Sequence, residues 1–201
     1  MTSQPPVRRN RQHRGRSVRR DAVRNHQKIL TAARAVVGEA GADATMEDIA
    51  SRAGVGVGTV YRRFASKEAL IDELLRLVLT EIVSAAEGAL QLADGQGLDE
   101  LLRAMGQSFA DHARYASLLL QRQTDPTVIR KIAAAIDELT ARAVAAGTVS
   151  PATTVADITA LIWAMRGLAQ ATGDVDVRAW QRFLRIHLAG LRSAEPATVV
   201  P

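Results

Sequence analysis

A chain of 201 residues, 47% hydrophobic and 23% charged, has the composition of an ordinary globular protein and the length of one or two compact units. The sequence contains no cysteine, which excludes disulfides and thiolate metal sites. It has no apolar run near the roughly 20 residues that span a bilayer, and its basic N-terminus lacks the apolar stretch of a signal peptide. We therefore expect a cytoplasmic protein without a membrane segment.

The net charge of +5 is unevenly distributed along the chain. Residues 1–67 hold 14 Lys/Arg and 5 Asp/Glu, a net charge of +9, whereas residues 68–201 hold 12 Lys/Arg and 16 Asp/Glu, a net charge of −4. A basic first third followed by a mildly acidic remainder indicates a polyanion-binding module joined to a part with a different role.

The first forty residues divide into two segments. Residues 1–20 contain seven arginines, two prolines and no apolar periodicity. This pattern predicts a disordered basic arm, which either lies on DNA or acts as a solubility tail. From Asp21 to Ala40 apolar residues recur every three or four positions, which predicts an amphipathic helix that Gly41 ends.

Residues 46–65 have the pattern of a helix-turn-helix. Ala50 is small where two crossing helices touch, and Gly54 can supply the positive φ of a tight turn. Thr45, with Asp48 three residues on, is predicted to cap the first of these helices. The second helix, 59–64, presents two arginines and a tyrosine hydroxyl, which suits insertion into a DNA major groove.

The remainder of the chain is predicted to be helical. A helix from 66 to about 92 spans roughly 37 Å, long enough to connect the two parts of the protein. Further helices are expected at 98–114, 115–122, 126–146, 151–171 and 177–193, with Asp125-Pro126 and Ser150-Pro151 as starts and Gly147 and Gly173 as stops. The expected fold is all-α with about nine helices, arranged as an arm (1–20), a three-helix DNA-binding domain (21–67), a second helical domain (68–193) and a flexible tail (194–201).

The stretch from about Gln27 to Leu75 resembles the tetracycline-repressor (TetR) family of bacterial transcription regulators. The most specific part is the succession Thr-Val-Tyr-Arg-Arg-Phe-x-Ser-Lys-Glu-x-Leu at residues 59–70. The resemblance implies a homodimeric regulator, usually a repressor, that binds double-stranded DNA at a near-palindromic operator. It also implies that residues 68–193 bind a small-molecule effector and dimerise. We expect no cofactor.

The resemblance also assigns roles to residues of the first part. Tyr61 and Lys67 are expected at phosphates, the hydroxyls of Thr45 and Thr59 as well, and Phe64 in the core. Because the entry to the second helix is rich in glycine, base readout is expected to depend on its arginines and on the arm. The residues expected to contact DNA are Thr45, Val57, Gly58, Thr59, Tyr61, Arg62, Arg63 and Lys67.

A small-molecule cavity is expected in the second domain. Met105, Phe109 and His112 share one helical face, and apolar walls with a few polar groups are typical of ligand sites. The alternative is ordinary core with a satisfied histidine. If Arg166 faces inward it favours an anionic ligand, and if not, a neutral one. The candidate ligand-binding residues are Met105, Phe109, His112, Tyr115, Trp163 and Arg166.

The last helix is expected to form a subunit contact. Apolar residues cover well over half of it, which predicts burial on two sides, the second by another subunit about a two-fold axis. The resemblance implies that the last two helices form this contact. The expected interface residues are Trp180, Phe183, Leu184, His187, Leu188 and Leu191.

Other functions fit less well. The glycines at 54–58 suggest a nucleotide loop, but no strand precedes them and no Gly-Lys-Ser/Thr follows. A di-iron enzyme in a helical bundle needs Glu-x-x-His pairs, and no glutamate here has a histidine three residues on. An architectural DNA-binding protein without an effector is a further alternative, although it has no need of some 130 further residues. The sequence therefore predicts a ligand-responsive DNA-binding regulator, with no catalytic residues and no metal.

Overall fold

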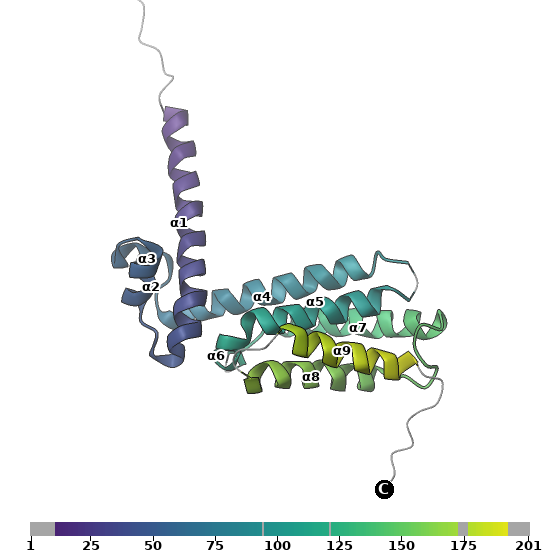
Figure 1. The fold of residues 1–201 in the computed structure, drawn as a ribbon. Helices are drawn as coiled ribbons and strands as arrows, with labels where there is room; N and C mark the ends of the chain where they lie inside the picture. The colour runs from purple at the N-terminus through teal and green to yellow at the C-terminus, as the bar shows by residue number, and fades with distance from the viewer. Residues whose placement is uncertain (1–10, 94, 121, 173–176, 193–201) are drawn as a thin grey trace, which may run out of the picture. The chain divides into compact units, whose positions relative to one another are not determined.

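The computed structural model describes residues 11–93, 95–120, 122–172 and 177–192, and these residues form helices joined by short turns and loops, with no strand. The all-α prediction is confirmed. The helices are α1 (Arg11–Ala40), α2 (Met46–Ala53), α3 (Val57–Arg63), α4 (Lys67–Ala89), α5 (Gly97–His112), α6 (Ala116–Leu120), α7 (Pro126–Ala145), α8 (Val155–Thr172) and α9 (Val177–Arg192), with short 3-10 helices at Gly41–Asp43 and Ala113–Tyr115 (Figure 1).

The chain divides into two compact units, residues 1–70 and 71–201. Helix α4 begins at Lys67 in the first unit and continues without a break to Ala89 in the second. In the described part of the chain, no helix is both long enough and apolar enough to cross a membrane.

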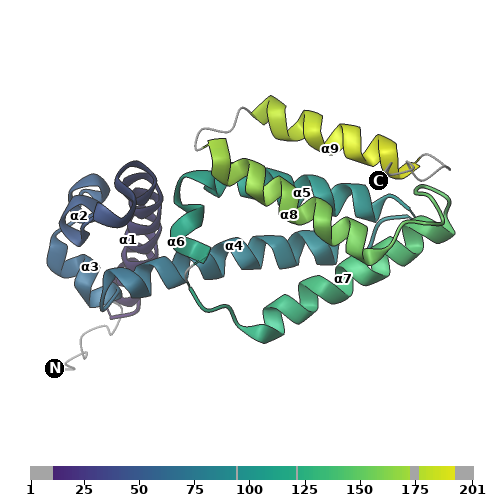
Figure 2. The ribbon, with the colours of Figure 1, turned by 90° about the horizontal axis from the view of Figure 1, so that it is seen from below.

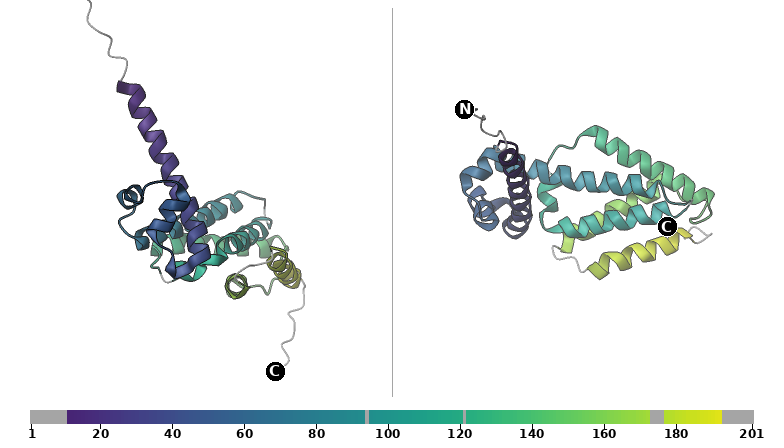
Figure 3. Two further views of the ribbon diagram at one scale, coloured as in Figure 1. Left: turned by 60° about the vertical axis from the view of Figure 1, so that its left-hand side comes forward. Right: turned by 90° about the horizontal axis from the view of Figure 1, so that it is seen from above.

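Helix α1 begins ten residues earlier than the sequence predicts. The expectation of a disordered arm is therefore wrong for residues 11–20, and residues 1–10 lie outside the described residues. Arginine is a good helix former, and a helix that is already nucleated extends at little cost. The buried residues Ile29, Ala33 and Val37 hold the C-terminal half of α1 in place. From there the helix extends toward its N-terminus without a kink (Figure 3).

The first unit is built around the tight turn between α2 and α3. Thr45 and Asp48 form the predicted capping box at the start of α2. Gly54 ends α2 with a φ of 66°, a left-handed conformation that favours glycine, and Ala50 and Val60 are both buried where the two helices meet. The predicted helix-turn-helix is confirmed.

The second unit is a helical bundle in which the long helices run roughly along one direction (Figure 2). Helix α5 is central and packs against α7, α8 and α9. Its Leu101 and Leu102 are fully buried, as are Leu74 of α4 and Ile158 and Met165 of α8.

Helix α8 begins at Val155, four residues after the predicted start at Pro151. Residues 150–153 form a turn instead, in which the Thr153 amide donates to the Ser150 carbonyl over 2.9 Å. The start is set by Thr154 and Asp157, because the Thr154 amide and hydroxyl both donate to the Asp157 carboxylate and the Asp157 amide donates back to the Thr154 hydroxyl.

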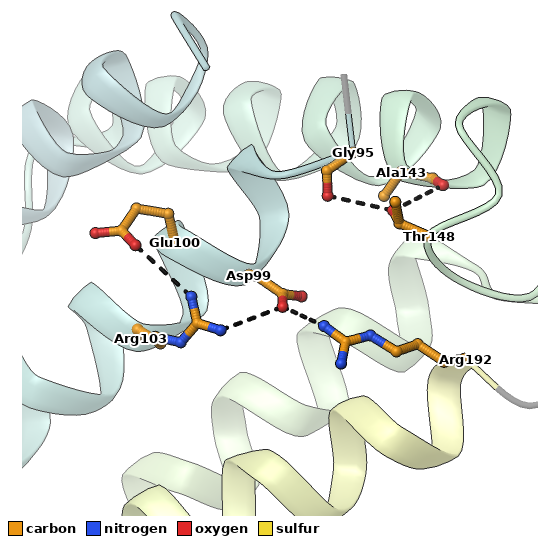
Figure 4. A network of polar contacts seen from close by, with 7 residues as sticks. All are labelled: Gly95, Asp99, Glu100, Arg103, Ala143, Thr148 and Arg192. Atoms are coloured by element: carbon orange, nitrogen blue, oxygen red, sulfur yellow. Dashed lines mark hydrogen bonds and ion pairs between the residues drawn. The ribbon is translucent and has the colours of Figure 1, made fainter. Parts of the chain in front are cut away.

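One end of the bundle is held together by a polar network (Figure 4). Arg192, the last residue of α9, pairs with Asp99 in the first turn of α5, and Arg103 donates to the same carboxylate over 3.3 Å. Beside them the Thr148 hydroxyl reaches the carbonyls of Gly95 and Ala143, 3.2 and 3.1 Å away. This network ties the end of α9 to α5 within one chain.

Candidate functional site

Helix α3 packs by one side and presents the other to solvent. Val60 is fully buried and Phe64, just after the helix, is 6% exposed, whereas Val57 and Tyr61 are 38% and 47% exposed. Gly58 and Arg62 lie on the same exposed side. A basic helix that offers a continuous outer face beyond a tight turn has the geometry of a major-groove recognition helix.

The two arginines of α3 are held differently. Arg62 donates through Nη2 to the Thr59 hydroxyl 2.9 Å away, one turn back on the same helix. Arg63 donates through Nε to Nδ1 of His26 on α1, also over 2.9 Å, and the His26 ring stacks on Phe64. Arg63 is thus attached to the core of the first unit while its side chain remains exposed.

Thr45 and Lys67 both form hydrogen bonds within the first unit, of which the sequence predicted only the cap formed by Thr45. The Thr45 hydroxyl accepts from the Asp48 amide over 3.1 Å and donates to the Asp48 carboxylate. The Lys67 ammonium donates to the carbonyls of Ala42 and Ala44 in the loop before α2. Thr-x-x-Asp spacing predicts the first arrangement, but no local signal predicts the second, because 23 residues separate Lys67 from Ala44.

The second unit contains a cavity of about 490 Å³ between α4, α5, α7 and α8. Of the six residues expected to bind a ligand, five line it: Met105, Phe109, His112, Trp163 and Arg166. Tyr115 does not, and that expectation is wrong. Its ring is 3% exposed and lies edge-on to His112, because the 3-10 turn at Ala113–Tyr115 directs it into the core.

Sequence reasoning expected α4 as a wall of the cavity without naming its residues, and it missed the wall that α7 forms. Helix α4 lines the cavity through Leu75 and Leu79, and α7 through Ile129, Ile132 and Ile136. The isoleucines recur with helical spacing, which shows that α7 is amphipathic but not that part of its apolar side faces a void.

His112 is both buried and part of the cavity wall. Its Nδ1 lies 2.6 Å from the Ser108 carbonyl, which can only accept, so Nδ1 carries the proton. Its Nε2 lies 4.0 Å from the Glu81 carboxylate. One ring nitrogen of His112 is therefore hydrogen-bonded within the core, as the alternative interpretation predicted. The residue nevertheless also lines the cavity.

Two arginines line the cavity, and they differ in the groups that contact their guanidinium. Arg122 is paired with the Asp72 carboxylate through contacts of 2.6 and 2.9 Å. Arg166 lies with its Cζ 4.8 Å from the centroid of the Trp163 ring, and burial lowers the pKa of Arg166 from its usual value. In the described part of the chain no ion pair is found for Arg166.

The comparisons with known proteins agree with this geometry. A family model described as bacterial regulatory proteins, tetR family, matches residues 29–74. A TetR transcriptional regulator from Streptomyces coelicolor is 31% identical, with 84% of this chain and 99% of that chain covered and a TM-score of 0.62. A TetR regulatory protein from Mycobacterium vanbaalenii is also 31% identical, with 88% and 99% covered and a TM-score of 0.63.

The chain belongs to the TetR family of bacterial regulatory proteins. Family members are transcriptional regulators and not enzymes, so the chain is a DNA-binding regulator. A curated relative, the HTH-type transcriptional regulator YvdT of Bacillus subtilis, is 41% identical over 66 residues, and the match spans about a third of the length of that relative (34%).

Helix α9 of this TetR-family protein is covered on one side within its own chain. Trp180, Leu184 and Leu188 are each at most 4% exposed, in a helix that packs on α5 and α8. One of the two predicted buried sides of α9 is therefore covered within the chain, and burial of the other side by a second subunit stays a prediction. Trp180, Leu184 and Leu188, which were expected at the subunit contact, lie on the side that α5 and α8 cover.

The other expected interface residues lie differently. Phe183 is half-buried and His187 exposed, with ring centroids 3.9 Å apart, and Leu191 is half-buried beside the turn at Ser150, whose amide donates to the Leu191 carbonyl. Ile186, which was not singled out, is 56% exposed.

Proposed function

We propose that this TetR-family protein is a homodimeric transcriptional repressor that acts in the cytoplasm, binds a near-palindromic operator and is released from it by a small molecule bound in the cavity. The observation that carries the proposal is the part that α4 plays in the cavity wall. Leu75 and Leu79 line the cavity, and the same helix continues without a break from Lys67 in the first unit.

The DNA-binding step is supported by the outer face of α3. Tyr61 and Arg62 lie on that face, and residues 1–67, the segment of sequence that contains α3, carry a net charge of +9. A guanidinium can pair with guanine through two hydrogen bonds, and basic residues around it attract phosphates. Each α3 would read one half of the operator.

The dimer is supported by an exposed stripe of small and apolar residues. On α8 and on α9, exposed or half-buried positions recur every three or four residues along one side of each helix. An added Cβ would meet nothing within 4 Å at either glycine of the stripe, so a helix of a second copy can approach closely there. The stripe consists of Ala156, Ala160, Ala164 and Gly167 on α8 and Ala179, Phe183, Ile186 and Gly190 on α9.

The dimer is tested by placing a charge in the stripe. Ile186→Asp should sediment as a monomer of 21.6 kDa, whereas the wild type should have twice that mass. Gln181→Asp adds the same charge at an exposed position outside the stripe and should leave the dimer intact. A dimeric Ile186→Asp protein would place the contact elsewhere.

Release by an effector requires that a ligand favour one arrangement of α4 over another. A coupling of about 1–3 kcal/mol, or 5–150-fold in affinity, is enough to switch a gene. Because α4 forms one wall of the cavity, a ligand contacts the helix that leads to the DNA-binding unit.

The whole proposal is tested by selecting duplexes from a random pool with the purified protein and screening metabolites for release. The selected sites should be near-palindromic, with half-sites separated by whole helical turns. Phe109→Ala should keep operator binding and lose release, because Phe109 lines only the cavity. A protein that selects no preferred sequence would be an architectural DNA binder instead.

A further inference from the structure

Among the described residues, no ion-pair partner is found for Arg166, a cation of the cavity wall. Arg166 stacks on Trp163, and burial lowers its pKa, which shows that its charged form is partly desolvated. The other arginine of the wall, Arg122, is already neutralised by Asp72. Among the described residues, no carboxylate forms an ion pair with the Arg166 guanidinium.

A partly desolvated guanidinium without an ion-pair partner loses some hydration free energy, which an anionic ligand can recover. The planar fork of arginine donates two parallel hydrogen bonds to a carboxylate, and stacking on an indole ring restricts the guanidinium plane beforehand. Trp163 therefore positions Arg166 to receive a planar anion.

We propose that the ligand of this cavity is an apolar organic acid whose carboxylate pairs with Arg166 while its apolar body lies among the aliphatic and aromatic side chains of α4, α5 and α7. This inference rests on the proposed function, since it names the class of effector for the same cavity.

The size and lining of the cavity fit such a body. An apolar cavity of about 150 Å³ accommodates benzene, and this cavity, at about 490 Å³, is roughly three times larger. Residues from three helices supply apolar walls, with Leu79, Met105 and Ile132 among them. This volume lies within the range of small-molecule sites.

The charge of the cavity favours a monoanion over other ligands. One uncompensated guanidinium matches one carboxylate, whereas a phosphate monoester carries about −1.5 to −2 at neutral pH and would bury excess charge. Asp137 also lines the cavity and is the group a cationic ligand would use. It is exposed and therefore hydrated, so it gains little from such a partner.

The inference is tested by calorimetry on the full-length protein with ligands that differ only in the head group. Decanoate, decanol and decylamine share one flexible body, and naphthoate and naphthamide share one rigid body. We expect at least one acid to bind at least about tenfold more tightly than its neutral counterpart, because the neutral head group cannot form the hydrogen-bonded charge pair. A neutral or cationic ligand that binds as tightly, or the failure of both acids to bind, would overturn the inference.

Substitutions of single arginines test which of them binds the carboxylate of the ligand. Arg166→Gln should remove the preference for the acid, whereas Arg130→Gln, an exposed residue of α7 outside the cavity, should keep it. Loss of the preference in Arg122→Gln but not in Arg166→Gln would show that the head group lies at Arg122 and would refute the assignment. The comparison of head groups on the wild type needs no variant and holds even if Arg166→Gln folds poorly.

The same acids separate this inference from the proposed function. An acid that binds through Arg166 but leaves operator affinity unchanged would support the ligand class and contradict effector-controlled release. Release of the operator by neutral molecules alone, bound in the same cavity, would support the proposed function and contradict the ligand class.

Discussion

Replacing Gly106 with alanine probes how α9 is held on α5. Gly106 lies in the middle of α5, and a Cβ added there would lie 2.6 Å from both Cε3 and Cζ3 of Trp180. Trp180 is 4% exposed, and its ring is rigid. The added methyl group cannot be accommodated by the end of a flexible side chain, so the ring or the whole of α9 must move.

The expected loss of stability is the difference between two effects. Overpacking a core typically costs about 1–3 kcal/mol, and a contact this short with a rigid ring places the cost near the upper end. Alanine is favoured over glycine inside a helix by about 1 kcal/mol. The net loss should be about 2 kcal/mol, which corresponds to a decrease in Tm of roughly 4–8 °C for a chain of this size.

The assay is urea unfolding at one fixed protein concentration, because the proposed dimer would make stability depend on concentration. The matched control is Gly88→Ala on α4, an exposed helical glycine where an added Cβ meets nothing within 4 Å, and it should gain up to about 1 kcal/mol. Combining Gly106→Ala with Trp180→Phe should cost less than the sum of the two single changes. If Gly106→Ala proved as stable as Gly88→Ala, the close packing of α9 on α5 would be wrong.

Three further predictions concern DNA binding and acid stability. Arg62→Ala should weaken discrimination at one base pair by about 1–3 kcal/mol, whereas Tyr61→Phe should weaken binding to operator and scrambled duplexes alike. If Arg62→Ala weakened binding to both duplexes equally, Arg62 would be a phosphate contact. Deleting residues 1–20 should flatten the slope of log K against log salt by about 0.9 for each phosphate that the arm neutralises, and an unchanged slope would leave the arm as a solubility tail. Hydrogen bonds from the Thr154 hydroxyl and amide hold the pKa of Asp157 below its usual value. Wild type should therefore be more stable than Asp157→Asn above about pH 4, and this difference in unfolding free energy should disappear as pH falls through the lower folded-state pKa. Urea midpoints across this range measure it, and a constant difference would contradict the argument.

The elements of the DNA-binding unit could be predicted because their signals are local. The reciprocal cap of Thr45 and Asp48 and the left-handed Gly54 involve residues at most four positions apart, and both are present as expected. The length of α1 could not be predicted in the same way. Its first turns have no apolar periodicity and form because a packed helix continues into them.

The cavity shows the limit of periodicity. The spacing of Met105, Phe109 and His112 places them on one face of α5, and all three line the cavity. The same reasoning grouped Tyr115 with them, but a turn directs its ring into the core. Helical spacing identifies an apolar face and does not say whether side chains or empty space lies against it.

The sequence by itself determined the helices, the tight turn, the basic character of residues 1–67 and the family, because caps, turn glycines and a contiguous motif act over a few neighbouring residues. Tertiary structure alone decided which apolar side of α9 is covered by α5, that the Lys67 ammonium binds the loop carbonyls, and that Arg166 stands in a cavity without a carboxylate partner among the described residues. Each of these depends on contacts between residues far apart in the chain, whose positions are set by the packing of whole helices.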